Sequence, residues 1–462
     1  MLDNIVTEKK MNFKEMEEKL FKCACEIVNC VMKETLEKYD EVLMKLRDKN
    51  RFRNKGKEKT SIKTKTGIVE YERTRYTEKK DDGSKNNIYL LDEEIGIANE
   101  LKGNVSQGLI DVIVKNISEL SYRACSNMLE QTTGMSLSST AIWNIIQDLG
   151  MKITEFEDNR VECKKEEQLK CGEKYTPAIF QEADGIMIVM QGKDRKIRKE
   201  KYQEEHPGEE VPKRVRNAEL KLGITYEGWK KEGKNRYKLV GKEYIAGFMD
   251  GDKMAELMQT SLYSKYDIGK IELNVTNSDG ASWIQKLVPK NGIYQADQYH
   301  VIEKIKQHIK EKEDLDMVLN LYYKREAQGI LKYIEELKKK CGGEYEEVKK
   351  LDELAGYIEK RKDQLARYNE NEEIKKKLKV YNEQTGLLYR NAGCQESNNY
   401  CELTKRFKRR RMSWTEKGAT NLVKVITTID SESCNDIFEY LKVDVSVENY
   451  KEFVDKHIEE TE

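Results

Sequence analysis

A change in hydrophobic periodicity near residue 178 constrains this chain more than any other feature of its sequence. Before that point, and again after about residue 300, apolar residues recur at helical spacings. Between them lie short runs of β-prone residues, most of them separated by turn residues. The pattern predicts strands at 178–190, 218–229 and 237–249, a helix at about 252–266, a strand at 270–275, a short helix from Trp283 and a strand near 292–296.

Three strands, a helix, a strand, a helix and a strand is the order of the ribonuclease H-like fold. Residues 302–385 then continue almost wholly helical, rich in Lys and Glu with periodic Leu, Ile and Tyr. We therefore expect an α/β (α+β) chain with a ribonuclease H-like core and a large α-helical insertion. A mostly helical region precedes that core.

Two aspartates stand where apolar packing alone does not explain them. Asp184 lies in the middle of the first strand, and alternation puts Glu182 on the same face. An acid inside an apolar run is costly to bury unless it binds something. Asp279 stands at the end of the fourth strand, which neighbours the first in this fold, and Gly185 and Gly280 leave room beside the two acids for a phosphate backbone. The alternatives are a turn or a salt-bridged acid at Asp184 and a plain turn at Asp279.

A third acid follows a break in the helical pattern near residue 393. Glu396 would open the helix that leads into the basic stretch 405–411, and Glu402 is its main competitor. Asp297 and His300 lie three residues apart at the start of a helix, where they either join the site or form a helix N-cap with a partly buried histidine.

Carboxylates on a rigid sheet suit one particular chemistry. Two Mg²⁺ ions about 3.5 to 4 Å apart can hold both the attacking and the leaving oxygen of a phosphodiester, and they need a few oxygen ligands on a stiff frame. Asp184, Asp279 and Glu396 are the predicted metal ligands and catalytic residues, with Mg²⁺ or Mn²⁺ as the cofactor.

The formal net charge is zero, but the basic residues are unevenly distributed. Two cationic stretches suit contacts with DNA phosphates. The candidate residues are Arg51, Arg53, Lys55, Lys57, Lys405, Arg406, Lys408, Arg409, Arg410 and Arg411. A small hairpin at 62–76 follows the first stretch and is either scaffold or a DNA contact. Residues 107–150 fit a helix-turn-helix with its recognition helix from Ser139, or an ordinary helical hairpin.

Several classes of protein are disfavoured. The ten cysteines form no Cys-x-x-Cys knuckle, so neither a zinc module nor a disulfide framework is indicated. No apolar signal core and no run of about 18 apolar residues is present, so we expect no membrane segment and a cytoplasmic, reduced protein.

Three motifs together resemble a known family. Asp184-Gly185, the run Ser278-Asp279-Gly280-Ala281-x-Trp283-Ile284 and Asp297-x-x-His300-Val301 look like the ISLre-type bacterial insertion-sequence transposases, which are related to the Mutator-like group. The resemblance extends over most of the chain, to the segment Arg411-Met412-Ser413-Trp414. The sequence after Glu396, Ser-Asn-Asn-Tyr-Cys, departs from that family's pattern.

The resemblance implies an Asp-Asp-Glu transposase that requires Mg²⁺ and carries a helical insertion before the Glu. Asp184, Asp279 and Glu396 match the catalytic triad, and Asp297 and His300 match the Asp-x-x-His signature and would position the scissile strand. The implied partners are double-stranded DNA, as terminal inverted repeats and target, and further copies of the chain in a homodimer or higher oligomer.

The expected organisation has five segments. They are N-terminal helices and a basic hairpin (1–100), a helix-turn-helix-like region (101–172), the core (173–301), the helical insertion (302–390), and a Glu-bearing basic helix with a C-terminal cap (391–462). A catalytically inactive DNA-binding protein that represses or inhibits transposition is the alternative function. A purely structural helical protein is disfavoured by the strands and the placement of the acids.

Overall fold

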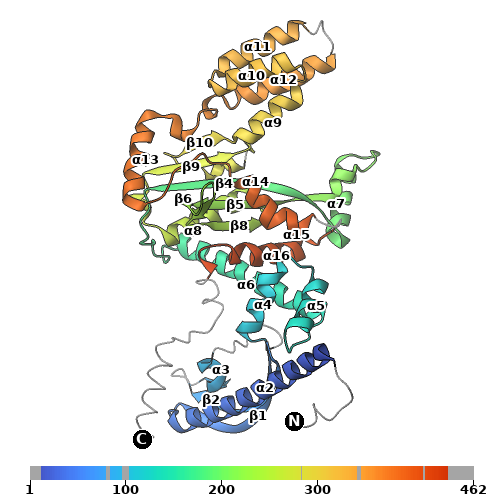
Figure 1. The fold of residues 1–462 in the computed structure, drawn as a ribbon, viewed down its shortest axis with the longest axis vertical. Helices are drawn as coiled ribbons and strands as arrows, with labels where there is room; N and C mark the ends of the chain where they lie inside the picture. Colours follow the sequence, from blue (N-terminus) through green and yellow to red (C-terminus); the bar gives the residue numbers. More distant parts are fainter. Residues whose placement is uncertain are drawn as a thin grey trace. The chain divides into compact units, whose positions relative to one another are not determined.

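The chain folds into two compact units, which Figure 1 shows in a computed structural model. The structure describes residues 12–79, 84–95, 104–281, 283–340, 345–408 and 412–434. Unit 1 comprises Met1–Phe156 with Ser433–Glu462, and unit 2 comprises Glu157–Glu432. Helices and strands both contribute extensively, so the predicted mixed α/β class is confirmed. The finer division into five segments stays a prediction.

Unit 1 begins with a long helix packed on a three-stranded antiparallel sheet. The sheet consists of strands β1 (Phe52–Thr64), β2 (Gly67–Lys79) and β3 (Lys85–Ile88). Helix α2 (Phe13–Leu46) packs on its central strand β2 and contacts α3 (Leu90–Glu94), which follows β3. The buried residues Ile62, Val69, Tyr71 and Leu91 form its core. The predicted hairpin is present but far larger than 62–76, because the basic stretch that precedes it pairs with β2 as strand β1.

Three further helices complete the described part of unit 1. They are α4 (Gln107–Ile117), α5 (Tyr122–Thr132) and the start of α6 (Ser139–Lys165). Ser106 and Ser121 cap α4 and α5, and the Ser138 hydroxyl accepts from the backbone of Ala141. The helix predicted to begin at Ser139 does begin there.

Unit 2 is built on a five-stranded mixed sheet. Its strands are β4 (Ala178–Val189), β5 (Asn217–Tyr226), β8 (Glu243–Gly247), β9 (Leu273–Ser278) and β10 (Ile293–Ala296), in the order β10-β9-β4-β5-β8. Strand β4 runs parallel to β9, which runs parallel to β10, whereas β4–β5 and β5–β8 are antiparallel. The central strand therefore has one parallel and one antiparallel neighbour.

Three predicted strands need correction. The third splits into β7 (Tyr237–Val240), which pairs with β6 (Gly228–Lys231) in a separate hairpin, and β8, which joins the main sheet. The second ends at Tyr226, and its last predicted residues belong to β6. The fourth begins three residues later than predicted, because Ile268–Lys270 forms a 3₁₀ turn. Helix α7 (Gly192–Glu205) was not predicted at all.

The two faces of the sheet differ in chemistry. Ala183 of β4 packs with Met254 and Met258 of α8 (Gly251–Lys265) in an aliphatic layer. On the opposite face, Phe180 stacks on Tyr226, with ring centroids 5.3 Å apart, and touches further aromatic rings. That second face becomes polar along β4, from Phe180 through Glu182 to Asp184, since alternate residues share a face.

The residues that follow β10 form helices with a core of their own. The helices are α9 (Gln298–His308), α10 (Lys312–Tyr323), α11 (Ala327–Lys340), α12 (Tyr345–Glu359) and α13 (Glu372–Thr385). Val301, Ile305, Ile330 and Leu354 are among the buried residues of this core. Figure 1 shows α10, α11 and α12 bundled beyond α9, on the β10 side of the sheet.

The chain then returns to the polar face of the sheet. Helix α14 (Gln395–Asn398) continues as a π-helical stretch (Asn399–Thr404) and α15 (Lys405–Phe407). Helix α16 (Glu416–Ile429) packs against β8, as expected of a helical C-terminal cap. An extended segment considered at 443–447 lies outside the described residues.

Two glycine substitutions should have opposite effects on the stability of unit 2. A Cβ at Gly172 would lie 2.1 Å from a backbone carbon of Lys265, whereas at the helical Gly356 it would meet nothing within 4 Å. We expect Gly172→Ala to lower the free energy of unfolding by about 1 to 3 kcal/mol. Gly356→Ala should raise it by about 0.4 to 1 kcal/mol, because the unfolded chain loses freedom. Urea denaturation of both variants checks the pair, and equal effects would contradict this packing.

Candidate active site

Three aspartates come directly after the last residues that pair between three adjacent parallel strands. Ser278 of β9 pairs with Ala183 of β4 and with Ala296 of β10. The next residue along each of these strands is an aspartate: Asp184, Asp279 and Asp297. Because neighbouring strands lie about 4.8 Å apart, the register brings the three residues into one row at the edge of the sheet.

The Asp184 carboxylate is half-buried, and the nearby carboxylate of Asp279 repels its negative charge. Burial raises the pKa of Asp184 to about 6, and the negative charge of Asp279 adds to the increase. The backbone N–H of Gly185 donates to Oδ1 at 2.7 Å and His300 lies close enough to counteract the shift. A cation bound between the two carboxylates would relieve both the burial cost and the repulsion.

Glu182 lies two residues before Asp184, on the same face of β4, and has a structural role. Its side chain is 0% exposed and no cation pairs with it among the described residues. Its carboxylate accepts from Tyr226 Oη at 2.5 Å and Asn277 Nδ2 at 3.1 Å. It also accepts from the backbone N–H groups of three successive residues that lead into α14: Gly393, Cys394 and Gln395. Glu182 therefore ties the start of α14 to the central strand.

Asn399, which sequence analysis missed, is the residue of the π-helical stretch that contacts Asp184. Its Nδ2 donates to Asp184 Oδ2 at 2.6 Å, and Gln395 Nε2 donates to its Oδ1. The signal was present in the sequence, since Asn399 follows Gln395 by four residues and so shares its helix face.

Glu396 lies on the exposed side of α14, in its first turn. The closest described partner is Tyr299, whose pKa is raised chiefly by the Glu396 charge, with a hydrogen bond to the same carboxylate. Tyr299 in turn packs edge-on against the His300 ring. Glu396 is thus linked to the aspartate row through α9 rather than by direct contact.

Glu402, the competing third acid, lies elsewhere. It is buried beneath Tyr244, whose hydroxyl lies 3.3 Å from Oε1. Burial raises the pKa of Glu402 to about 8, and the neighbouring Asp430 adds to the increase. The structure gives it no contact with Asp184 or Asp279.

Asp297 performs the helix-capping role that was one of its two predicted alternatives. Its Oδ1 accepts from the backbone of Tyr299 and His300, and its Oδ2 accepts from Asn277 Nδ2 at 2.7 Å. Asn277 also donates to Glu182, so this amide bridges the two carboxylates. Asp297 thus fixes the start of α9, the helix that carries His300, and is held by the same polar network.

Arg361 is a second residue that the sequence did not reveal. From the insertion, its Nη2 donates to the backbone carbonyls of Asp279 and Gly280 at 3.3 and 3.0 Å. Gly280 has a φ of +92°, and a Cβ there would collide with the guanidinium, so only glycine fits this loop. By contrast, the space beside Gly185 that could admit a phosphate holds the Glu219 side chain.

The donor set suits a hard cation with a partly open coordination shell. Mg²⁺ commonly takes one or two carboxylates and completes its shell with water and substrate phosphates. Asp184 and Asp279 provide such a pair. No group of three His, Cys, Asp or Glu side chains suited to a metal occurs in the described part of the chain. The third ligand would thus require Glu396 to turn toward the aspartates.

The candidate DNA-binding residues fall into different surroundings. Lys408 is exposed, whereas Arg406 is 3% exposed and stacks against Trp414, so its charge does not face solvent. Residues 409–411 lie outside the described residues. Arg51, just before β1, pairs with Glu78. On β1, Lys57 pairs with Glu41, while Arg53 and Lys55 are exposed.

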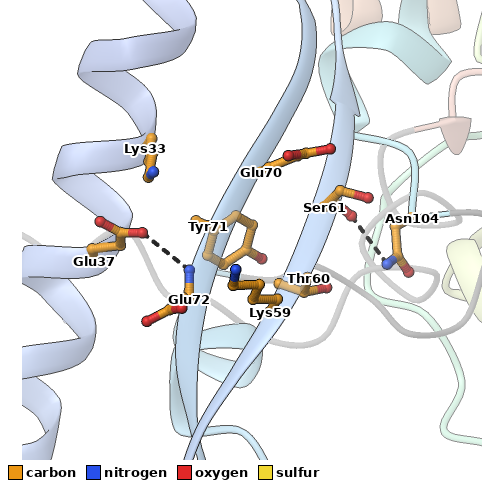
Figure 2. Close-up of a pocket in the computed structure, with 9 residues that line it drawn as sticks. All are labelled: Lys33, Glu37, Lys59, Thr60, Ser61, Glu70, Tyr71, Glu72 and Asn104. Carbon is orange, nitrogen blue, oxygen red and sulfur yellow. Dashed lines mark hydrogen bonds between the residues drawn. The ribbon is translucent and has the colours of Figure 1, made fainter.

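The side of the hairpin that faces α2 is not cationic. A cleft of about 750 Å³ lies there. Figure 2 shows that Glu37 accepts from the backbone of Glu72 and that Asn104 donates to the carbonyl of Ser61. The charged lining of the cleft consists of two lysines and three glutamates: Lys33, Lys59, Glu37, Glu70 and Glu72. The exposed cations Arg53 and Lys55 do not line this cleft.

Neutralising Asp184 should stabilise the metal-free protein. The pKa of Asp184 is about 6 in the folded chain, against an ordinary value of 3.8 for an aspartate in the unfolded chain, so the folded form binds this proton more tightly. The contribution of Asp184 to stability therefore increases as the pH falls from above 6 to below 4. In EDTA at pH 8, Asp184→Asn should raise the free energy of unfolding by about 1 to 3 kcal/mol.

Urea denaturation at two pH values measures this effect. The gain should shrink at pH 4.5, where the wild-type carboxyl is mostly protonated in the folded state. A variant less stable than the wild type at pH 8 would contradict the claim that the ionised Asp184 carboxylate destabilises the folded protein.

The fold and the site define a mixed α/β protein with a row of acids at the edge of its parallel strands. The chain belongs to the uncharacterised protein family UPF0236, whose family model matches residues 6–213 and 203–433. Two UPF0236 proteins of Caldanaerobacter subterraneus subsp. tengcongensis are each 25% identical to it, over 378 and 377 residues. A UPF0236 protein in the region 3′ of vanSb in Streptococcus gallolyticus is 22% identical over 349 residues.

These matches cover most of this chain but less of the relatives. They span 80%, 80% and 73% of the chain, and 66%, 70% and 66% of the three relatives. The chain thus spans about two thirds of the length of the relatives. Within the described residues, no helix is long and apolar enough to cross a membrane.

Proposed function

We propose that this protein is a Mg²⁺-dependent DNA transposase that cuts DNA at the ends of an insertion sequence and joins the freed ends to a target. The observation that carries the proposal is the pair Asp184 and Asp279, on adjacent parallel strands, with the pKa of Asp184 raised by burial and by its neighbour. Such a strained acidic pair in an open row is a candidate site for a metal that handles phosphates.

The strand order supports a ribonuclease H-like core. Numbered along the chain, the five strands of the sheet lie in the order 3-2-1-4-5, with the second antiparallel to both its neighbours. That order and those directions are the ones expected of this fold. The insertion between the last strand and α14 also occupies the expected place.

Each residue of the site has a role in the proposed reaction. Bound Mg²⁺ would activate first a water and then a DNA 3′ hydroxyl as the nucleophile. Asp184 and Asp279 would hold it, with Glu396 as the third carboxylate. Glu182 and Arg361 position the two segments that carry these acids, and His300 lies where it could orient the scissile strand.

The relatives give independent support. Eleven UPF0236 members of Caldanaerobacter share one name, and four share another. Many paralogues in one genome are the expected result of an element that moves. The resemblance to ISLre-type transposases agrees with that distribution.

A catalytically inactive DNA-binding protein that represses or inhibits transposition is the second candidate. The exposed position of Glu396, away from the two aspartates, favours it. An inactive copy would retain its DNA contacts but would lack metal-dependent cleavage.

Nicking of a duplex that carries the element's own terminal repeat tests the proposal. Cleavage in Mg²⁺ or Mn²⁺ that stops in EDTA supports the transposase. DNA binding without cleavage in any metal favours the inactive protein, and the absence of both excludes the two candidates together.

A further inference from the structure

A cationic pocket lies beside α14, on the β6–β7 hairpin of unit 2. Its volume is about 490 Å³, within the range of small-ligand sites. Four of its lining residues are basic and none is acidic: Arg236, Lys238, Lys242 and Arg390. Cys394, Ser397 and Asn398 form its other wall. Those three residues flank Glu396, so a ligand held here would lie within a helical turn of the proposed third carboxylate.

Two of the four cations have no acidic partner in the described part of the chain. Arg236 pairs with Glu232, and Lys242 lies near the buried Glu402. Arg390 instead stacks over the Tyr237 ring, 3.6 Å from its centroid, and Lys238 forms no described ion pair. Arg390 is exposed, and a guanidinium stacked on an aromatic ring can still bind phosphate oxygens through its N–H groups.

From this arrangement we infer that the pocket binds a single-stranded segment of the DNA substrate, with backbone phosphates on Arg390 and Lys238. Sites for single strands combine a cationic surface with aromatic side chains, and Trp229 and Tyr237 line this pocket. A cavity of this size admits a nucleotide or two but not a duplex. The inference rests on the proposed function, because only DNA opened near the cut offers such a strand to α14.

The test compares two double variants of the full chain. Arg390→Gln with Lys238→Gln removes the two cations, while Lys230→Gln with Lys231→Gln removes two exposed lysines of the same hairpin that lie outside the pocket. Binding of a single strand of about 12 nucleotides, within the site size of common single-strand binding folds, and of a blunt duplex is measured by fluorescence anisotropy at several salt concentrations.

The pocket variant should bind the single strand at least about tenfold more weakly, and the slope of log K against log salt should fall by about 1.4, or about 0.7 for each phosphate that is no longer neutralised. The control variant should keep the wild-type slope. Equal behaviour of the two variants would overturn the inference. If the wild type nicks DNA but the two variants bind alike, only the role of the pocket is contradicted. If binding depends on the pocket but no metal supports nicking, the proposed cleavage is contradicted.

An independent observation concerns the N-terminal part of α2 in unit 1. Every residue from Phe13 to Lys22 is exposed, and Phe13 is 74% exposed. Apolar or sulfur side chains recur at alternating spacings of three and four: Phe13, Met16, Leu20, Cys23, Ile27 and Cys30. This heptad stripe lies opposite the face that holds Asp40 and Leu43 against β2, although Ile27 also borders a pocket that Ile62 and Val105 line. A helical arm of this length is marginal alone in water.

We propose that this stripe pairs with the same helix of a second copy, in antiparallel orientation. An alignment that sets Leu20 opposite Cys23 of the other copy also sets Met16 opposite Ile27 and Phe13 opposite Cys30. Lys19 then faces Glu26 across the seam, twice in the dimer. A parallel alignment would instead bring Lys33 near Lys38, a repulsive pair.

Sedimentation and cross-linking test this pairing. Leu20→Glu with Ile27→Glu should yield a monomer at concentrations where the wild type and the Lys22→Glu control are dimers. Oxidation of the Leu20→Cys variant should give a covalent dimer in which the introduced thiol of one copy is joined to Cys23 of the other. A wild-type monomer, or a dimer that survives the Glu variant, would overturn the proposal, as would cross-linking through Cys23 alone, which only a parallel pair allows.

Discussion

Asp184→Asn is expected to abolish metal-dependent cleavage while leaving the protein folded and able to bind DNA. The change keeps the size of the side chain, although its single amide oxygen can accept from only one of Gly185 and Asn399, and it removes one of the two charges that would hold Mg²⁺. Loss of a direct metal ligand should slow cleavage by at least about a thousandfold, or about 4 kcal/mol in the barrier. Nicking of terminal-repeat DNA in Mg²⁺, with DNA affinity measured in parallel, checks the result.

A matched control separates this effect from a general change of charge. Asp316→Asn makes the same chemical change at an exposed site on α10 and should leave cleavage unchanged. Retention of more than about a tenth of the activity in Asp184→Asn would contradict the metal role, and joint loss of cleavage and DNA binding would point to a structural role.

Glu182→Ala should cause the largest loss of stability of any substitution near the site. The change leaves the buried donors of Tyr226 and Asn277, and three backbone N–H groups, without their acceptor. Buried donors without acceptors each cost about 1 to 3 kcal/mol, although relaxation limits the sum, so we expect a loss of about 3 to 5 kcal/mol. Chemical denaturation of the purified protein measures it.

Two comparisons make that prediction specific. Tyr226→Phe removes one donor and should cost only about 1 to 2 kcal/mol, and Glu219→Ala at a half-exposed acid should stay within about 0.5 kcal/mol. Because Glu182 also fixes the start of α14, Glu182→Gln should retain the fold but weaken cleavage. A Glu182→Ala protein as stable as Glu219→Ala would show that the network is dispensable.

The central elements were predictable because their residues follow simple periods. Strand β4 carries Ile179 and Ala183 on the α8 face and Phe180, Glu182 and Asp184 on the other, and this alternation is visible in the sequence. The same rule placed Asp279 just after a strand and Asp297 just before a helix, as the structure confirms.

The errors arose where tertiary pairing overrides local pattern. Residues 237–249 read as one strand, but the turn at Gly241, with a φ of +70°, splits them between two sheets. The basic stretch before the hairpin was not predicted as a strand, yet its residues from Phe52 onward form β1 by pairing with β2. No local pattern in the sequence predicts that Arg361, about eighty residues away, donates to the backbone of the loop that carries Asp279.

The third carboxylate shows the limit of motif spacing. Glu396 was chosen for its position before the basic helix, and α14 does begin there. Which side chain of a helix turns toward a sheet depends on how the helix docks, and here Glu182 docks α14 with Gln395 and Asn399 inward. The role of Glu396 as a ligand therefore remains a proposal.

Metal-directed cleavage of the polypeptide tests the central claim most directly. Fe²⁺ bound in place of Mg²⁺, with ascorbate and peroxide, cuts the chain next to the metal, and the fragments are identified by mass spectrometry. The account predicts cuts near Asp184 and Asp279, two segments far apart in the sequence, and their loss in Asp184→Asn. Cuts elsewhere, or an unchanged pattern in the variant, would contradict a metal site between these two aspartates.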